Sequence, residues 1–210
     1  MEVILALFVV ALGAGTATSL IVSSLQANTF SRNNLVAMNL AVEGLEAMQN
    51  ILDTNRLKFG FDKSNCWNLT PQSATGDCKI PYPQIEEGYY TIDLNPSNYS
   101  WGLTSIAAGL DLSNNALATN DDYKLGYVGI NNINGKDVFV TNALIPIIVN
   151  PTITGSGESN FYRMIQIDYP TNNPANDEYM DVISTVQWDQ NGVHTVRLPT
   201  TLANYEKVPL

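Results

Sequence analysis

Charged side chains are scarce in this chain, and basic side chains are the scarcest. Only 14% of its 210 residues are charged, and ten Lys and Arg stand against twenty Asp and Glu, which gives a formal net charge of -10. The basic residues are scattered without a run, whereas proteins that neutralise phosphate groups cluster them. A nucleic-acid partner is therefore not expected.

Cysteine and histidine are also rare. The chain has two cysteines, Cys66 and Cys78, and one histidine, His194, which lies far from them in the sequence. A structural zinc site needs four ligands of these types, so the composition argues against one. Two cysteines in one loop-like segment favour a disulfide, formed in an oxidising compartment, over two free thiols.

Motifs typical of catalysis are missing as well. No serine stands in a G-x-S-x-G context, no glycine-rich loop matches a phosphate cradle, and His194 stands beside a predicted turn as an ordinary strand residue. The segment "DLSNNALATNDD" (111–122) carries oxygen ligands without the spacing of an EF-hand, so a Ca²⁺ site there stays an alternative. We expect no catalytic residue, no metal site, no cofactor and hence no enzyme.

The N-terminal segment lacks both charge and proline. No charged residue lies between Val3 and Val22. As a helix, this stretch would span about 30 Å, the thickness of the hydrocarbon core of a bilayer. A cleaved secretory signal would begin with basic residues, whereas the first basic residue here is Arg32. The pattern predicts a helix whose apolar surface is covered by lipid, by a partner or by copies of the same chain.

The helix is expected to continue through "NNLVAMNLAVEGLEAMQNILDTNRLKFG" and to end near Gly60, because a basic residue followed by glycine is typical of a helix C-terminus. We therefore assign residues 1–60 to one helix, with a hydrophobic membrane or filament-core half (1–25) and an amphipathic half (26–60). Apolar residues recur in the second half at spacings of three and four, which predicts one buried face. The residues of this face are Leu35, Met38, Val42, Leu45, Met48 and Leu52.

Glu2 is the one acidic residue beside the apolar run. A carboxylate inside a membrane costs about 2.5–3.5 kcal/mol at a helix centre and less near the interface, so it suggests a function. The nearest available cation is the α-amine at a chain N-terminus. The alternative is that Glu2 only benefits from the positive end of the helix dipole in the first turn.

The remainder is predicted to form a disulfide-containing loop (61–88) and a β-sheet head domain (89–210). A chain-entropy argument gives about 3 kcal/mol for closing the Cys66–Cys78 loop. Asn134-Gly135 and Asn191-Gly192 mark hairpin turns. The predicted strands are Tyr89–Leu94, Tyr123–Ile130, Val138–Val140, an edge strand in "NALIPIIVNP", Tyr162–Tyr169, Tyr179–Trp188 and Val193–Leu198. One strand face, expected to pack on the amphipathic half of the helix, carries Met180, Val182, Val186 and Trp188. The fold class is α+β.

Two further patterns leave alternatives open. The aromatic residues Trp67, Tyr82, Tyr89, Tyr90, Tyr99 and Trp101 could form an adhesive patch, but packing under the disulfide loop is favoured. Asn68-Leu-Thr70 and Asn98-Tyr-Ser100 match the glycosylation sequon, which is frequent by chance in a chain rich in asparagine.

"EVILALFVVALGAG", followed by a long helix, resembles the N-terminal signature of the type IV pilin superfamily, which includes type IV pilins and the pseudopilins of type II secretion. Glu2 matches the family glutamate, and Val3 to Leu12 match the apolar helix after it. The second half of the helix, and the C-terminal "FYRMIQIDY" and "MDVISTVQWDQNGVHTVRLPTTLANY", resemble a subgroup with an N-methylation motif. Residues 61–160 resemble a pilin-type variable region. The resemblance implies a type IV pilin fold.

The resemblance also implies a life cycle. The protein would cross the cytoplasmic membrane once, a prepilin peptidase would remove a basic leader and methylation of the new amine would follow. The pilus assembly machinery would then extract subunits into an extracellular filament, a homopolymer in which Glu2 pairs with the amine of a neighbour. The family usually has four residues before this glutamate, and here only Met1 precedes it. The assembly residues would thus be Glu2 and Met1, but three missing residues displace the amine of Met1 by about 4.5 Å, so we expect a truncated or re-assigned start, or unusual processing.

A second departure concerns helix breaking. Many pilins carry a proline near the end of the apolar segment, whereas this chain has Gly13 and Gly15 there. Each glycine costs a helix about 1 kcal/mol relative to alanine. Either the helix unwinds at these glycines in a filament, or the small residues allow close helix packing.

The sequence therefore predicts a structural filament subunit, a pilin that serves adhesion or motility. The alternatives are a pseudopilin of a type II secretion-like machine and a membrane-anchored monomeric binding module.

Overall fold

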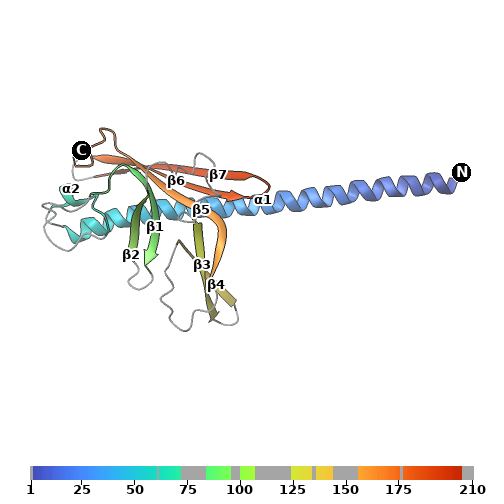
Figure 1. Ribbon diagram of the computed structural model, residues 1–210, viewed down its shortest axis with the longest axis horizontal. Helices are drawn as coiled ribbons and strands as arrows, with labels where there is room; N and C mark the ends of the chain where they lie inside the picture. Colours follow the sequence, from blue (N-terminus) through green and yellow to red (C-terminus); the bar gives the residue numbers. More distant parts are fainter. Residues whose placement is uncertain are drawn as a thin grey trace. The chain divides into compact units, whose positions relative to one another are not determined.

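In the computed structural model, one long helix, α1 (Glu2–Lys58), is followed by a short helix and an antiparallel sheet (Figure 1). The structure describes residues 2–60, 62–71, 84–95, 100–106, 124–133, 136–143, 156–175 and 177–204. The chain divides into two compact units, Met1–Val36 and Ala37–Leu210. The predicted α+β class, with a long N-terminal helix and an antiparallel sheet, is confirmed, and the arrangement is consistent with a pilin-like fold.

The described residues of the second unit form seven strands and the short helix α2 (Lys63–Cys66). The strands are β1 (Gly88–Asn95), β2 (Ser100–Ile106), β3 (Lys124–Ile133), β4 (Lys136–Ala143), β5 (Ser156–Asp168), β6 (Tyr179–Asp189) and β7 (Val193–Ala203). β5 pairs with β1, β3 and β6, while β2, β4 and β7 pair outward from these, and every pairing is antiparallel. β2 and α2 were not predicted.

The turn between β6 and β7 is the one that the Asn-Gly pair predicts. Asn191 has φ 57° and Gly192 has φ 134°, which are backbone conformations that asparagine and glycine accept readily. The Gly192 N–H donates to Asp189 Oδ1 at 3.1 Å. The resulting register pairs Trp188 with His194. The other predicted turn, Asn134-Gly135, and most of "NALIPIIVNP" lie outside the described residues.

The prediction of the buried face of α1 is wrong for its first three residues. Met48 and Leu52 are buried, but Leu35, Met38 and Val42 are 63%, 41% and 42% exposed. The residues of α1 that are buried instead are mostly small: Ala37, Leu40, Ala41, Gly44, Ala47, Met48, Ile51, Leu52 and Asn55.

Gly44 gives the physical reason for this shift. A Cβ atom at this position would lie 2.7 Å from Ser184 Oγ, 3.0 Å from Ile165 Cδ1 and 3.2 Å from Arg163 Cδ. α1 therefore lies so close to the sheet that any side chain here would force its neighbours to shift. The predicted face was chosen by the spacing of large apolar residues, whereas the face that is buried carries mostly small residues and lies beside it on the helix.

The main core joins α1 to the sheet. It contains Met48, Ile51 and Leu52 from the helix, with Ile165, Ile167, Met180 and Val182 from β5 and β6. The predicted strand face is confirmed, because Met180, Val182, Val186 and Trp188 are all buried. Of the aromatic residues weighed as an adhesive patch, Trp67 and Tyr90 are buried in this core, and Trp101 packs against it with part of its surface exposed.

α1 ends near the predicted position, but not by the predicted glycine cap. Gly60 is not among the described residues with positive φ. Instead, the Phe59 N–H donates to Asn55 O at 2.9 Å. The Asn55 side chain donates to Trp67 O (3.1 Å) and Leu69 O (2.7 Å), which ties the following segment back to the helix.

Cys66 is buried beside Phe59 and Leu69 and takes part in a disulfide. Its predicted partner, Cys78, lies outside the described residues. Asn68, the first residue of one glycosylation sequon, is fully buried, and its Nδ2 donates to Tyr169 Oη (3.2 Å) and Pro174 O (2.8 Å). This amide is therefore not accessible to a glycan in the folded head.

Candidate functional site

The candidate functional site is the apolar surface of the first unit. Every residue from Glu2 to Arg32 is exposed. The large apolar side chains on this surface are Val3, Ile4, Leu5, Leu7, Phe8, Val9, Val10, Leu12, Leu20, Ile21, Val22, Leu25 and Phe30. An 18-residue window of α1 has a mean hydropathy of 2.2, and none of that window is buried. By length and composition, α1 could span a membrane.

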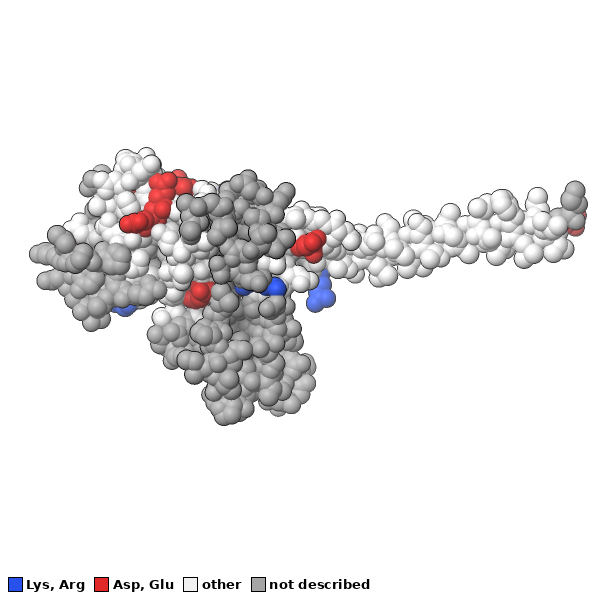
Figure 2. Space-filling model, in the orientation of Figure 1, with Lys and Arg blue, Asp and Glu red and all other residues white. Residues whose placement is uncertain are grey.

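No charged side chain interrupts this apolar surface between Glu2 and Arg32 (Figure 2). Three threonine hydroxyls on it donate to the backbone of the same helix. Thr16 Oγ1 donates to Gly13 O at 3.0 Å, Thr18 Oγ1 to Ala14 O at 2.8 Å and Thr29 Oγ1 to Leu25 O at 2.9 Å. Because these donors are satisfied by the helix backbone, the cost of placing them in an apolar environment is reduced.

Glu2 lies in the first turn of α1 and is exposed. It forms no ion pair with any residue that the structure describes, and Met1 lies outside those residues. The position agrees with the favourable effect of the helix dipole on a carboxylate in the first turn. A role for Glu2 in assembly needs a second chain and stays a prediction.

α1 is helical without interruption through Gly13 and Gly15. A Cβ atom added at either glycine would meet nothing within 4 Å among the described residues. In the single chain, therefore, neither glycine is required by a close contact. The two predictions for an assembled form, unwinding and close helix packing, both remain.

A second exposed apolar group lies further along α1, and we call it the helix ridge: Leu35, Met38 and Val42. Residues at spacings of three and four share one side of a helix. This side of the helix was predicted to face the core, and the structure instead leaves it exposed. Exposed apolar side chains thus occur along α1 as far as Val42.

Arg163 holds α1 to the sheet inside the second unit. Its side chain is almost fully buried, and it donates to Leu40 O on α1 and to Ile92 O on β1, both at 3.1 Å. It also pairs with Glu43 of α1 at 3.4 Å. Burial lowers the pKa of Arg163, and the nearby Glu43 carboxylate opposes that shift.

Asp93 on β1 completes this charged centre. Burial raises the pKa of Asp93 to about 6, with Arg163 acting in the opposite direction. Its Oδ1 atom is buried and has no hydrogen-bond partner among the described residues. This centre was not predicted from the sequence, although the lone arginine in the apolar strand "FYRMIQIDY" is a pattern that indicates a buried charge.

Of the residues weighed for catalysis and metal binding, the structure describes His194 and Cys66. Within the described ranges, no group of three His, Cys, Asp or Glu side chains is placed to hold a metal ion. The His194 Nε2 atom lies 3.1 Å from Gln190 O, and its ring lies 5.3 Å from that of Trp188. The segment 111–122, considered for Ca²⁺, lies outside the described residues.

Comparisons of the chain with protein-family models, with curated proteins and with solved structures gave no match.

Proposed function

We propose that the chain is a pilin, the structural subunit of a type IV pilus-like extracellular filament that serves adhesion or motility. The observation that carries this proposal is the length of the exposed apolar surface on α1. It begins at Val3 and returns at the helix ridge, which ends at Val42. The antiparallel head and the resemblance of both chain ends to type IV pilins support it.

A bilayer alone does not match this length. From Val3 to Val42 a helix rises about 60 Å, whereas the hydrocarbon core is about 30 Å thick. Lipid can cover residues 3–25, but the helix ridge then stays in water. Burying a large apolar side chain contributes about 1.5–3 kcal/mol, so covering the helix ridge would contribute several kcal/mol to the free energy of association with a partner. Copies of the same chain offer apolar helices that can cover both regions.

Glu2 acquires a role in such an assembly. Packed apolar helices exclude water, and an unpaired carboxylate among them is penalised by several kcal/mol. The amine of a neighbouring subunit is the cation that can pair with it. We propose that this pair sets the register of neighbouring subunits, and that each subunit spans the cytoplasmic membrane once before assembly.

The test compares Glu2→Ala with the control Glu46→Ala, which removes an exposed carboxylate from the same helix. Sheared surface fibres are examined by electron microscopy and their N-terminal peptide by mass spectrometry, while membrane fractions are assayed for the subunit. We expect Glu2→Ala to abolish the fibres but leave membrane insertion intact, and Glu46→Ala to retain both. Fibres formed by Glu2→Ala, or wild-type cells without fibres of this chain, would contradict the proposal.

A membrane-anchored monomeric binding module is the second candidate, because α1 is long and apolar enough to span a membrane. It predicts that Glu2→Ala leaves surface display unchanged and that no fibres exist. A pseudopilin would share the dependence on Glu2 but would form no long surface fibres, so fibre length separates it from a pilin.

A further inference from the structure

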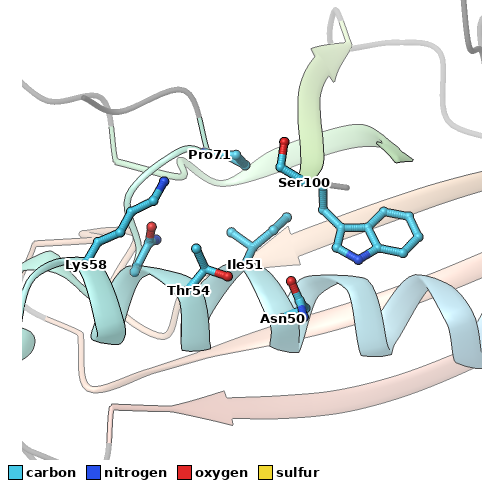
Figure 3. A pocket seen from close by; sticks show the side chains of 8 residues that line it. Asn50, Ile51, Thr54, Lys58, Pro71 and Ser100 are labelled. Atoms are coloured by element: carbon cyan, nitrogen blue, oxygen red, sulfur yellow. The ribbon is translucent and has the colours of Figure 1, made fainter. Parts of the chain in front are cut away.

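A pocket of about 240 Å³ lies in the second unit, between the last turns of α1, Pro71 and the start of β2. Asn50, Thr54 and Lys58 follow one another along the helix on the side that faces Pro71 and Ser100 (Figure 3). Pockets that take drug-sized ligands are usually about 300–1,000 Å³. This pocket is therefore of a size for one small ring.

The helix wall of the pocket carries three polar side chains without a partner among the described residues, beside Asn55, whose amide is bonded to Trp67 O and Leu69 O. Asn50, Thr54 and Lys58 recur at a spacing of four, and none makes a side-chain hydrogen bond or ion pair within the described part of the chain.

The other wall is partly aromatic and fixed in position. Trp101 lines the pocket, packs against the main core and is partly buried. Its backbone is held by pairing with Leu94 across β1 and β2. An anchored indole beside amide and hydroxyl groups suits a pyranose ring, whose C–H face packs on an aromatic ring while its hydroxyls need both donors and acceptors.

Lys58 places a positive charge at the pocket. It is exposed, and no carboxylate pairs with it among the described residues, although the chain carries twice as many acidic as basic residues. An ammonium group at the pocket favours an anionic ligand and disfavours a cationic one. We propose that this pocket binds one acidic sugar unit, a pyranose that carries a carboxylate, of the uronic-acid or sialic-acid type. The site is independent of filament assembly.

The experiment uses the full chain, solubilised in a detergent without a sugar head group. Saturation-transfer NMR and titration measure binding of glucuronic acid, N-acetylneuraminic acid and the neutral sugar glucose. We expect millimolar dissociation constants for at least one acid, about five- to tenfold tighter than for glucose. Absence of binding of both acids to the wild-type protein overturns the proposal, and so does equal binding of glucose.

Two pairs of variants locate the site. Lys58→Gln should remove the preference for the acid, whereas Arg32→Gln, which removes an exposed cation of α1 outside the pocket, should keep it. Trp101→Ala should abolish binding of all three sugars, and Trp101→Phe, which retains an aromatic face, should bind within about threefold of wild type. An unchanged preference in Lys58→Gln, or an equal loss in Arg32→Gln, overturns the assignment to this pocket.

Two further titrations distinguish a uronic-acid polymer from a sialylated glycan as the source of the acidic sugar. Wild-type protein is titrated with an oligosaccharide of alternating uronic acid and with a sialylated oligosaccharide, each beside its carboxyl-reduced form. Tighter binding of either acidic oligomer than of its reduced form supports the proposal and identifies the glycan class. Equal binding of acidic and reduced forms for both oligomers overturns it.

Discussion

The close approach of α1 to the sheet at Gly44 makes a quantitative prediction. In Gly44→Ala, the new methyl group would lie 2.7 Å from Ser184 Oγ, which is closer than such atoms approach. Alanine favours a helix over glycine by about 1 kcal/mol. Overpacking a tight core typically costs 1–3 kcal/mol. The two effects together predict a net loss of about 1 kcal/mol in the free energy of unfolding.

Ser184 allows this reasoning to be tested with a double-mutant cycle. Its Oγ atom is buried and has no hydrogen-bond partner in the described residues, so Ser184→Ala alone should be neutral or slightly stabilising. In Gly44→Ala/Ser184→Ala the closest contact is gone, and the remaining neighbours, Ile165 Cδ1 and Arg163 Cδ, belong to side chains that can shift. We expect a favourable coupling of about 1 kcal/mol between the two substitutions.

The assay is urea unfolding of the full chain in detergent micelles, followed by fluorescence of the buried Trp67 and Trp188. Gly13→Ala is the control, because it makes the same change in the same helix where a Cβ meets nothing within 4 Å. It should not lower the stability of the head. If Gly44→Ala were more stable than wild type and showed no coupling to Ser184→Ala, α1 could not lie as close to β6 as the structure places it.

The charged centre gives two further predictions. The pKa of Asp93 in the folded state, about 6, exceeds its ordinary value of 3.8, so the folded protein binds the extra proton and stability falls as pH rises from about 4 to 6. We expect Asp93→Asn to remove most of this decline, at most about 2 kcal/mol, as measured by urea midpoints between pH 4 and 8. Arg163→Met should destabilise the head by about 3 kcal/mol at pH 7, because it leaves Leu40 O and Ile92 O buried without this donor. An Arg163→Met protein as stable as wild type in the same assay would refute the role given to this arginine.

Elements with strong local patterns were predictable from the sequence. The uninterrupted apolar run predicted the N-terminal part of α1. The alternation of apolar and polar residues, together with the turn at Asn191-Gly192, predicted the hairpin of β6 and β7. β2 (Ser100–Ile106) was not predicted because its sequence does not alternate between apolar and polar residues. In the structure, Leu103 is its one buried residue. Its position depends on pairing with β1, which no local pattern encodes.

The contacts of α1 were less predictable for a related reason. Periodicity finds an apolar side of a helix but does not say whether the sheet or another molecule covers it. Leu35 was therefore wrongly predicted to be buried, and the close contact at Gly44 was not predicted. The pocket lined by Asn50, Thr54 and Lys58 could not be predicted either. Its opposite wall includes Trp101, which lies on β2, a strand far from α1 in the sequence.

The threonine hydroxyls of the first unit have a consequence for how α1 can change its surroundings. Since Thr16, Thr18 and Thr29 donate to carbonyls of the preceding turn, these three hydroxyls need no hydrogen-bond acceptor from lipid, water or a neighbouring chain when α1 moves between such environments. The cost of transferring these threonines is thereby lowered, and Glu2 is the one charged side chain before Arg32 that must be solvated or paired in each environment.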